Sequence, residues 1–228
     1  MKKILRYTLA IVLLLYFLAT FIVSPILDKR MNLVEYSDPR QLETEAQELY
    51  NSLEFIADLH CDALLWDRDL TKQLDYAHLD FPRMQQANMS LQAFTIVTKS
   101  PKGQNFKQNS ADAFDEITML NFVQGRLPDK WFSLYKRAEY QARALQDYQK
   151  KFAGKFLLVK SRQDLKKLIA LKKTEPEVIG GFLGIEGAHC LEGNLDNVQN
   201  LYYEGVRMMA PTHFFDNELG GSAHGITG

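Results

Sequence analysis

The pattern of hydrophobic and polar positions along the chain predicts an apolar N-terminal segment followed by alternating strands and helices. An apolar run spans residues 7–27, and short apolar runs of strand length come after it. We expect strands at residues 55–62, 91–97, 178–185 and 206–211, and residues 156–160 form a short β-compatible run. We expect helices at residues 38–53, 110–124, 130–152, 161–173 and 195–204. This alternation indicates βαβ units and a mostly parallel sheet.

Several of these helix ends carry capping signals. Asp38 followed by Pro39 is typical of an N-cap and a first helical position. Ser161, with Asp164 three residues later, resembles a capping box. Gly205 is placed to end the helix 195–204 as its C′ residue.

The N-terminal run has the length and the flanking charges of a membrane segment. Residues 7–23 are 17 positions without a charge, at the lower edge of the roughly 17–25 that cross a bilayer as a helix. Lys2, Lys3 and Arg6 precede the run, and the positive-inside rule then favours an N-terminus in the cytoplasm. We therefore predict a single-pass signal anchor within residues 1–30. It leaves the rest of the chain in the periplasm or the extracellular space.

Two other interpretations of this run remain open. A cleaved signal peptide needs a small-x-small site after its apolar core, and residues 19–21 (ATF) and 23–25 (VSP) match that pattern poorly. A buried helix of a soluble protein is the third interpretation, although the run is apolar on all sides and lies beside basic residues. Both the anchor and the cleaved signal place the remaining chain outside the cytoplasm.

The composition is that of an ordinary globular protein. Hydrophobic residues make up 46% of the chain and charged residues 24%, and 27 basic residues stand against 28 acidic ones. These values exclude a disordered, collagen-like or disulfide-scaffold chain. Without a run of basic residues there is no electrostatic signature of nucleic-acid binding, so we expect no nucleic-acid partner.

The first candidate chemistry lies at the end of the strand 55–62. Asp58, His60 and Asp62 are spaced by two, so on a strand all three side chains point to one face. Two carboxylates and an imidazole are costly to bury unless a metal or a counter-charge compensates them. A His-x-Asp pair at a strand end suits a divalent metal. The alternative is a solvated His and Asp that bind only each other.

Two further predicted strands end in residues of the same kind. Glu186 ends the run 178–185, and His213 follows the strand 206–211. Parallel strands end at one edge of their sheet, where barrels and open α/β sheets build their sites, so this coincidence favours a functional site. The glycines at 180, 181 and 184 match neither nucleotide fingerprint and indicate a strand where backbones approach closely.

From about residue 55 to residue 228 the chain resembles the membrane (renal) dipeptidases. These are zinc-dependent hydrolases on a (β/α)₈ barrel within the amidohydrolase-like group. The resemblance rests on several motifs in the correct order and at plausible spacing. They occupy residues 58–62, 79–83, 92–94, 184–187, 205–207 and 212–217.

The resemblance implies a mechanism and its residues. His60 and Asp62 would bind one zinc ion, and Glu186 would bridge it to a second. A hydroxide between the two metals, with its pKa lowered by them, would attack the peptide carbonyl of a dipeptide. His213 matches the histidine that contacts the substrate near the scissile group and helps to hold the oxyanion. A homodimer is also implied.

We expect the chain to cover only the N-terminal part of such a barrel. A full barrel takes about 250 residues, and only about four of its eight strands are predicted here. The resemblance places two later histidines for the second zinc, an arginine for the substrate carboxylate and an acidic proton shuttle beyond residue 228. The expected division is therefore an anchor at 1–30, a linker and helix at 31–54, and an incomplete barrel at 55–228.

The sequence thus predicts a membrane-anchored, zinc-dependent dipeptidase-like hydrolase. One alternative is a related metal-dependent amidohydrolase that acts on another amide or a lactam. The other is a truncated, inactive relative that persists as a membrane-anchored module.

Overall fold

The apolar runs after residue 55 form the strands of one parallel sheet. The computed structural model describes residues 2–35 and 41–227. The strands are β1 (Ile56–Cys61), β2 (Met89–Ile96), β3 (Phe156–Leu158), β4 (Ile179–Ile185) and β5 (Val206–Met209). Their bounds agree with the predicted strands to within two residues, and all of their pairings are parallel. The prediction of βαβ units is therefore confirmed.

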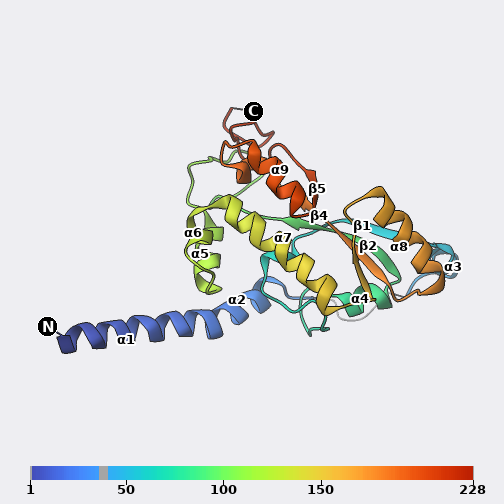
Figure 1. The fold of residues 1–228 in the computed structure, drawn as a ribbon, viewed down its shortest axis with the longest axis horizontal. Coiled ribbons are helices and arrows are strands. Elements are labelled where there is room, and N and C mark those ends of the chain that lie inside the picture. The colour runs from blue at the N-terminus through green and yellow to red at the C-terminus, as the bar shows by residue number, and fades with distance from the viewer. Residues whose placement is uncertain (1, 36–40, 228) are drawn as a thin grey trace.

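The central strand of the sheet is β4. One edge of β4 pairs with β2 along its length, and β1 lies on the far side of β2. The other edge of β4 pairs with β3 at residues 179–181 and with β5 at residues 183–185. The strands β1, β2, β4 and β5 therefore follow one another in sequence order, as in a barrel, and the short β3 lies beside the start of β4 (Figure 1).

Helices and helical turns connect and cover these strands. The N-terminal helix consists of α1 (Lys2–Leu18), a π-helical turn η1 (Ala19–Val23) and α2 (Ser24–Met31). The longer helices of the domain are α3 (Thr44–Ser52), α5 (Glu116–Val123), α7 (Leu134–Lys151), α8 (Arg162–Thr174) and α9 (Asp196–Tyr203). The shorter ones are η2 (Ala63–Leu65), α4 (Phe81–Gln86), α6 (Asp129–Phe132) and η3 (Ala188–Leu191).

Besides the helix expected at 38–53, which begins at Thr44, two predicted helices differ from the structure. The helix expected at 110–124 starts at α5, because Asp115 rather than Ser110 caps it by accepting from the amide of Ile117. The helix expected at 130–152 is divided into α6 and α7 at Ser133. The Ser133 hydroxyl accepts from the amide of Lys136 and so starts a new helix. In both places a second capping residue within the segment decided the boundary.

Other capping signals have mixed outcomes. Ser161 caps α8 as predicted, and its hydroxyl exchanges hydrogen bonds with Asp164. Gly205 follows α9 with a φ of 101°, which a C′ glycine adopts readily. The predicted N-cap at Asp38 lies outside the described residues, and the helix that follows begins only at Thr44. The short helix α4, capped by Asp80, was not predicted.

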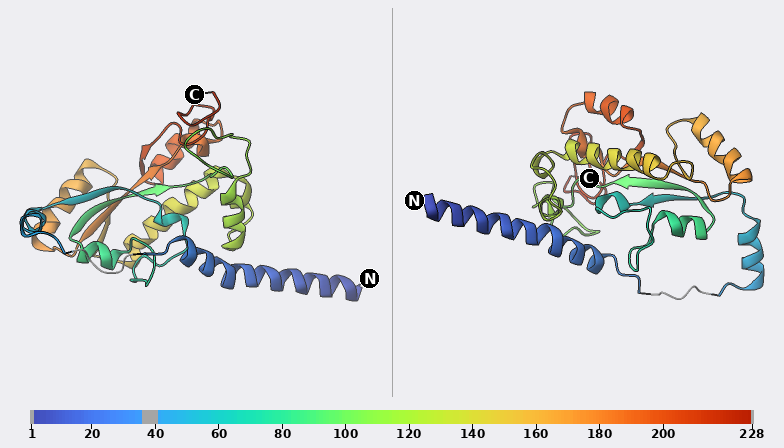
Figure 2. Two further views of the ribbon diagram at one scale, coloured as in Figure 1. Left: turned by 180° about the vertical axis from the view of Figure 1, so that it is seen from behind. Right: turned by 60° about the horizontal axis from the view of Figure 1, so that its bottom comes forward.

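The N-terminal helix runs along one side of the domain and projects beyond it (Figures 1 and 2). It is a single helix, Lys2–Met31, of 30 residues, long and apolar enough to cross a membrane. None of the residues of α1 is buried. The helix widens to a π-turn just before Pro25, which has no amide hydrogen for the preceding turn, and the amide of Ser24 donates to Ala19.

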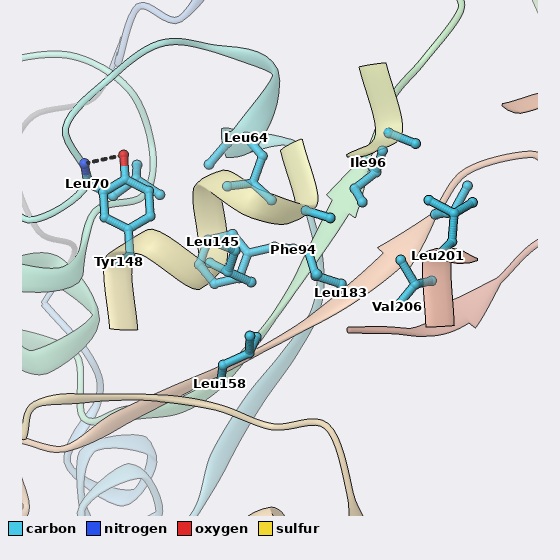
Figure 3. Close-up of a cluster of buried hydrophobic side chains, with 14 of the residues drawn as sticks. Leu64, Leu70, Phe94, Ile96, Leu145, Tyr148, Leu158, Leu183, Leu201 and Val206 are labelled. Atoms are coloured by element: carbon cyan, nitrogen blue, oxygen red, sulfur yellow. Dashed lines mark hydrogen bonds between the residues drawn. The ribbon is translucent and has the colours of Figure 1, made fainter. Parts of the chain in front are cut away.

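The core packs on both faces of the sheet. On one face, Leu145 of α7 lies beside Phe94, and the hydroxyl of Tyr148, also on α7, accepts from the backbone amide of Leu70 at 3.3 Å (Figure 3). On the other face, a smaller cluster gathers around α8. Its buried members are Leu91, Val159, Leu168 and Val178. Burial of such side chains, at about 1.5–3 kcal/mol each, holds the helices against the sheet.

The glycines of β4 make this packing possible. A Cβ at Gly180 would clash with Leu168 Cδ2, and one at Gly181 would lie 2.8 Å from the rings of Phe94 and Phe156. Successive strand residues face opposite sides, so Gly180 admits α8 on one face and Gly181 admits the aromatic rings on the other. The strand predicted from the glycine run is present, but side chains rather than neighbouring backbones approach its glycines.

Candidate metal centre

The carboxyl ends of three parallel strands bring the predicted site residues together. His60 lies near the end of β1, Asp62 follows it, and Glu186 follows β4 directly. His213 lies in the loop after β5. Because the strands are parallel and β2 joins β1 to β4, all four residues lie at one edge of the sheet.

Three of these residues offer their polar atoms to one point. His60 Nε2 lies 2.5 Å from Glu186 Oε1 and 3.5 Å from Asp62 Oδ1. One potential ligand atom from each of the three lies within 4.8 Å of the others. The imidazole nitrogen and the two carboxylate oxygens form a donor set that suits a divalent metal such as zinc. The donor chemistry therefore fits the metal that the sequence predicted.

Asp58 does not join this group, although its spacing from His60 and Asp62 predicted that it would share their face. Its Oδ1 accepts instead from the backbone amide of His60 at 3.1 Å. The pairing register of β1 with β2 shifts between Asp58 and Cys61. Such an irregularity breaks the strict alternation of side chains, so Asp58 braces the strand end.

His213 approaches the group from the other side of Glu186. Its Nδ1 lies 3.6 Å from Glu186 Oε2, whereas His60 faces Oε1. Burial lowers the pKa of His213, which keeps the ring neutral near pH 7. His60 and His213 therefore face different oxygens of the Glu186 carboxylate.

The site has a buried, anionic centre. The side chain of Glu186 is 11% exposed, compared with 56% for His60. Burial, and then the nearby Asp62 carboxylate, raise the pKa of Glu186 to about 7. A bound cation would offset both effects, because it compensates the charge that the protein has withdrawn from water.

Two supporting residues were not predicted from the sequence. The hydroxyl of Thr95, on β2, hydrogen-bonds Asp62 Oδ1 and so orients that carboxylate. Gly187 has a φ of 76°, and a Cβ there would lie 2.6 Å from the His189 ring. For Thr95 the available signal was a polar residue within the otherwise buried run 91–97. For Gly187 it was a glycine directly after a strand-end carboxylate.

The four residues open into a cleft of about 680 Å³. His60, Asp62, Glu186 and His213 line its polar side. Its remaining lining includes apolar side chains of α5 and two residues of α2. They are Ile117, Leu120, Val123, Leu27 and Met31. The N-terminal helix therefore contributes directly to the wall of the candidate site, which sequence reasoning missed.

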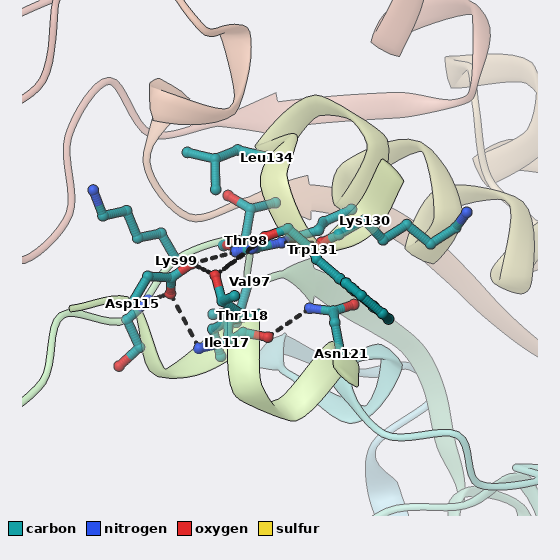
Figure 4. Close-up of polar contacts among 12 residues, drawn as sticks. Val97, Thr98, Lys99, Asp115, Ile117, Thr118, Asn121, Lys130, Trp131 and Leu134 are labelled. Atoms are coloured by element: carbon teal, nitrogen blue, oxygen red, sulfur yellow. Dashed lines mark hydrogen bonds and ion pairs between the residues drawn. The ribbon is translucent and has the colours of Figure 1, made fainter. Parts of the chain in front are cut away.

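A buried arginine holds this wall in place. Arg137 of α7 is 1% exposed and pairs with Asp115, the cap of α5, at 2.5 Å. Figure 4 shows Asp115 and Thr118 at the start of α5, close to Thr98 and Trp131. It also donates to the Thr118 hydroxyl at 2.7 Å and to the carbonyl oxygens of Thr98 and Trp131, each at 2.6 Å. One guanidinium thus connects the end of β2, the start of α5 and the end of α6.

Comparison with known proteins identifies the family. The family model described as Membrane dipeptidase (Peptidase family M19) matches residues 43–227. The chain belongs to this family. The membrane dipeptidase resemblance seen in the sequence is therefore confirmed. A search of curated proteins finds no match.

Three solved structures resemble the chain. The dipeptidase AC, a metallo peptidase, shares 20% identity at a TM-score of 0.47, over 69% of this chain and 42% of that one. A metallo peptidase from Rhodobacter sphaeroides, solved with a phosphinate mimic of the dipeptide L-Ala-D-Ala, shares 17% sequence identity at a TM-score of 0.46. The match covers 69% of this chain and 45% of that chain. The probable dipeptidase PvdM from Pseudomonas aeruginosa shares 15% sequence identity at a TM-score of 0.51. The match covers 72% of this chain and 36% of that chain.

These comparisons bear on the fold. The likeness to PvdM confirms the predicted class, an α/β fold with a parallel sheet like the first part of a (β/α)₈ barrel. An apolar helix precedes it, as predicted. This chain spans less than half the length of each solved relative, at 42%, 45% and 36%.

Proposed function

We propose that this chain carries part of a metal-dependent centre for the hydrolysis of dipeptides. The observation that carries the proposal is the meeting of His60, Asp62 and Glu186, whose ligand atoms lie within 4.8 Å of one another. They meet in a chain that belongs to the membrane dipeptidase family. The substrate class follows from the family, and the position of the chemistry follows from the geometry.

The three residues have separate parts in holding the metal, which we take to be zinc. His60 contributes Nε2, and Asp62 contributes a carboxylate oxygen that the Thr95 hydroxyl orients. Glu186 would hold the metal through its carboxylate, whose Oε1 faces His60 and whose Oε2 faces His213. When bound, zinc lowers the pKa of its water to about 7 and polarises the substrate carbonyl.

His213 acts on the substrate. Its neutral ring has one N–H donor, and it stands on the opposite side of Glu186 from His60. A donor in that place hydrogen-bonds the carbonyl oxygen of the scissile bond and stabilises the negative charge that develops there. The apolar side of the cleft, formed by α5 and α2, receives the side chains of the dipeptide.

The N-terminal helix anchors this centre to a membrane. The exposed apolar helix Lys2–Met31 crosses the bilayer as an uncleaved signal anchor, with the N-terminus in the cytoplasm and the cleft on the other side. Basic residues at the N-terminal end support this orientation. The homodimer implied by the family, the second zinc and the division into segments 1–30, 31–54 and 55–228 stay predictions.

Metal content and turnover test the proposal. The full chain, purified in detergent, is expected to bind zinc, and the His60→Ala variant is expected to lose the ion held by His60, Asp62 and Glu186. His78→Ala is the matched control, because His78 is exposed and does not belong to the group. A panel of dipeptides should be hydrolysed only by the zinc-loaded protein. Equal zinc content in both variants, or turnover that survives a chelator, would refute the assignment.

A further inference from the structure

An apolar groove runs between the N-terminal helix and the turn that joins α5 to α6. It has a volume of about 570 Å³. Val12, Leu15 and Tyr16 line it from α1, and Phe122, Leu127 and Trp131 line it from the domain. We refer to residues 122–132 as the α5–α6 turn. None of the residues that line this groove lines the cleft of the candidate metal centre, so the groove has no role in the proposed hydrolysis.

The two walls of the groove are fixed relative to each other. The rings of Tyr16 and Phe122 pack with their centroids 5.5 Å apart. Gly125, with a φ of 71°, allows Thr20 to approach, because a Cβ there would lie 2.7 Å from Thr20 Cγ2. Arg137 holds the turn from the other side through the carbonyl oxygen of Trp131. The α5–α6 turn is thus held against the helix that anchors the chain.

The position of the groove along the helix determines its depth in a bilayer. Tyr16 lies seven residues before Val23, after which the polar Ser24 and then Pro25 interrupt the apolar run. At 1.5 Å per residue this places Tyr16 about 10 Å before that interruption. Any domain residue that touches Tyr16 shares its depth. Interfacial elements bury their apolar faces by about 5–10 Å, so the α5–α6 turn lies where such elements lie.

The surface chemistry of the turn suits that depth. Phe132 is 81% exposed and Leu127 is 67% exposed. Arg126 turns its guanidinium inward, to Asp67 at 2.9 Å, and Asp129 pairs with Lys130 at 2.9 Å. The charges of the turn are therefore paired with partners.

The aromatic content of the groove also favours an interface. Tyr16 and Trp131 line it from opposite walls. Tyrosine and tryptophan are enriched where a membrane protein meets the boundary between headgroups and acyl chains. An open apolar groove of this kind, bordered by a membrane helix, is filled by lipid more favourably than by water.

We propose that the α5–α6 turn is a second membrane contact, which inserts into the leaflet on the domain side and receives acyl chains of the bilayer in its groove. The proposal rests on the proposed anchor, because the anchor sets the depth. The anchor also sets how the cleft of the candidate metal centre faces the membrane. Leu27 and Met31 lie about 6 and 12 Å beyond Val23 along the helix, so the cleft opens directly above the membrane surface.

A fluorescent label on the turn tests the proposal. The Phe132→Cys variant of the full chain is labelled with a polarity-sensitive fluorophore and reconstituted into phosphatidylcholine vesicles that carry nitroxide-labelled acyl chains. Tyr203→Cys is the matched control, because Tyr203 is 74% exposed and lies on α9, far from the anchor. The native thiols react slowly, since Cys190 is buried and Cys61 is partly buried.

The label on the Phe132→Cys variant is expected to shift to shorter wavelength. The nitroxides should quench it about twofold more strongly than the label on the Tyr203→Cys variant, as a depth of about 5–10 Å requires. Equal quenching at the two positions overturns the proposal. A label that is shielded from water but not quenched also overturns it, because a protein partner or a second copy would then cover the turn.

Alkaline carbonate extraction separates this proposal from the anchor on which it rests. Protein that stays in the vesicles with an unquenched label on the Phe132→Cys variant overturns the second contact and leaves the anchor standing. Protein released by carbonate overturns both. Leu127→Cys, at a second exposed position of the turn, repeats the measurement independently of any effect of replacing Phe132.

Discussion

Arg68 Nε lies 3.3 Å from Asp28 Oδ2, and this ion pair joins the N-terminal helix to the domain. The two side chains are only 5% and 9% exposed. The hydroxyl of Tyr76 donates to Asp28 Oδ2 at 3.2 Å, and the side-chain amide of Asn32 donates to Asp28 Oδ1 at 2.9 Å. The end of the helix is therefore built into the domain, next to the cleft that its residues help to line.

Asp28→Ala is expected to destabilise the domain by about 3–5 kcal/mol, because it leaves the buried Arg68 without its counter-charge. The measurement is urea unfolding of the full chain in detergent. Lys29→Ala is the matched control on the next residue. Lys29 pairs with Asp75 at 2.7 Å on the surface, so its loss should leave the midpoint nearly unchanged. Similar midpoints for the two variants would contradict the structural role of the buried pair.

Arg137→Met is expected to cost about 3–5 kcal/mol for the same physical reason. It leaves the carboxylate of Asp115 without its partner and three loop segments without their shared donor. Arg143→Met, also on α7, is the control, since Arg143 is 57% exposed and its ion pairs lie at the surface. Thermal unfolding compares the two. If Arg137→Met were as stable as Arg143→Met, the hydrogen-bond network of Arg137 would contribute little to the stability of the fold.

Zinc is expected to stabilise the folded chain through the candidate centre. A ligand that binds only the native state adds about 2.7 kcal/mol when its concentration is 100 times its Kd. This gain should appear as a raised unfolding midpoint in the wild type and should be lost in Asp62→Ala. Thr95→Val should retain the fold and weaken the zinc effect, because it removes only the hydroxyl that orients Asp62. Equal zinc stabilisation in all three proteins would remove Asp62 from the ligand set.

His189 is expected to make the stability of the chain depend on pH. Neither of its ring nitrogens has a hydrogen-bond partner among the residues that the structure describes. Burial lowers the pKa of His189 from 6.5 to about 4. His189 is therefore protonated below about pH 6.5 in the unfolded chain, but only below about pH 4 in the native state. Stability is thus lost as the pH falls through this window.

His189→Phe should remove this loss, since a phenyl ring fits the contact with Phe215 and does not titrate. The loss amounts to about 2–3 kcal/mol between about pH 7.5 and 4.5. Urea unfolding of the metal-free wild type and of the variant at both pH values measures the difference. Taking that difference also cancels the effect of Glu186, whose raised pKa acts in the opposite direction. Parallel pH profiles would mean that His189 is protonated or hydrated in the folded protein.

The sequence was most informative where structure is decided locally. The strands were found because apolar runs of strand length stand between turn and cap signals, and Ser161 with Asp164 marked the start of α8 correctly. Helix boundaries failed where two capping residues compete. Ser110 and Asp115 are both suitable caps, and the tertiary pair of Asp115 with Arg137 accompanies the one that is used.

The candidate site shows the same division. The order of the strands and the parallel sheet were enough to place His60, Asp62 and Glu186 at one edge, and the structure brings them within 4.8 Å of one another. The exclusion of Asp58 could not be foreseen, because it depends on a shift in the pairing of β1 with β2. The support of Asp62 by Thr95 depends on the same pairing of neighbouring strands.

The sequence by itself determined the fold class, the family and the apolar helix, because these depend on periodicity, motif order and the length of one segment. Only the tertiary structure decided that this helix lies against the domain and closes one side of the cleft. Contacts such as Asp28 with Arg68 and Tyr16 with Phe122 join residues 40 and 106 positions apart. Their formation depends on how the whole chain packs, and no local pattern records it.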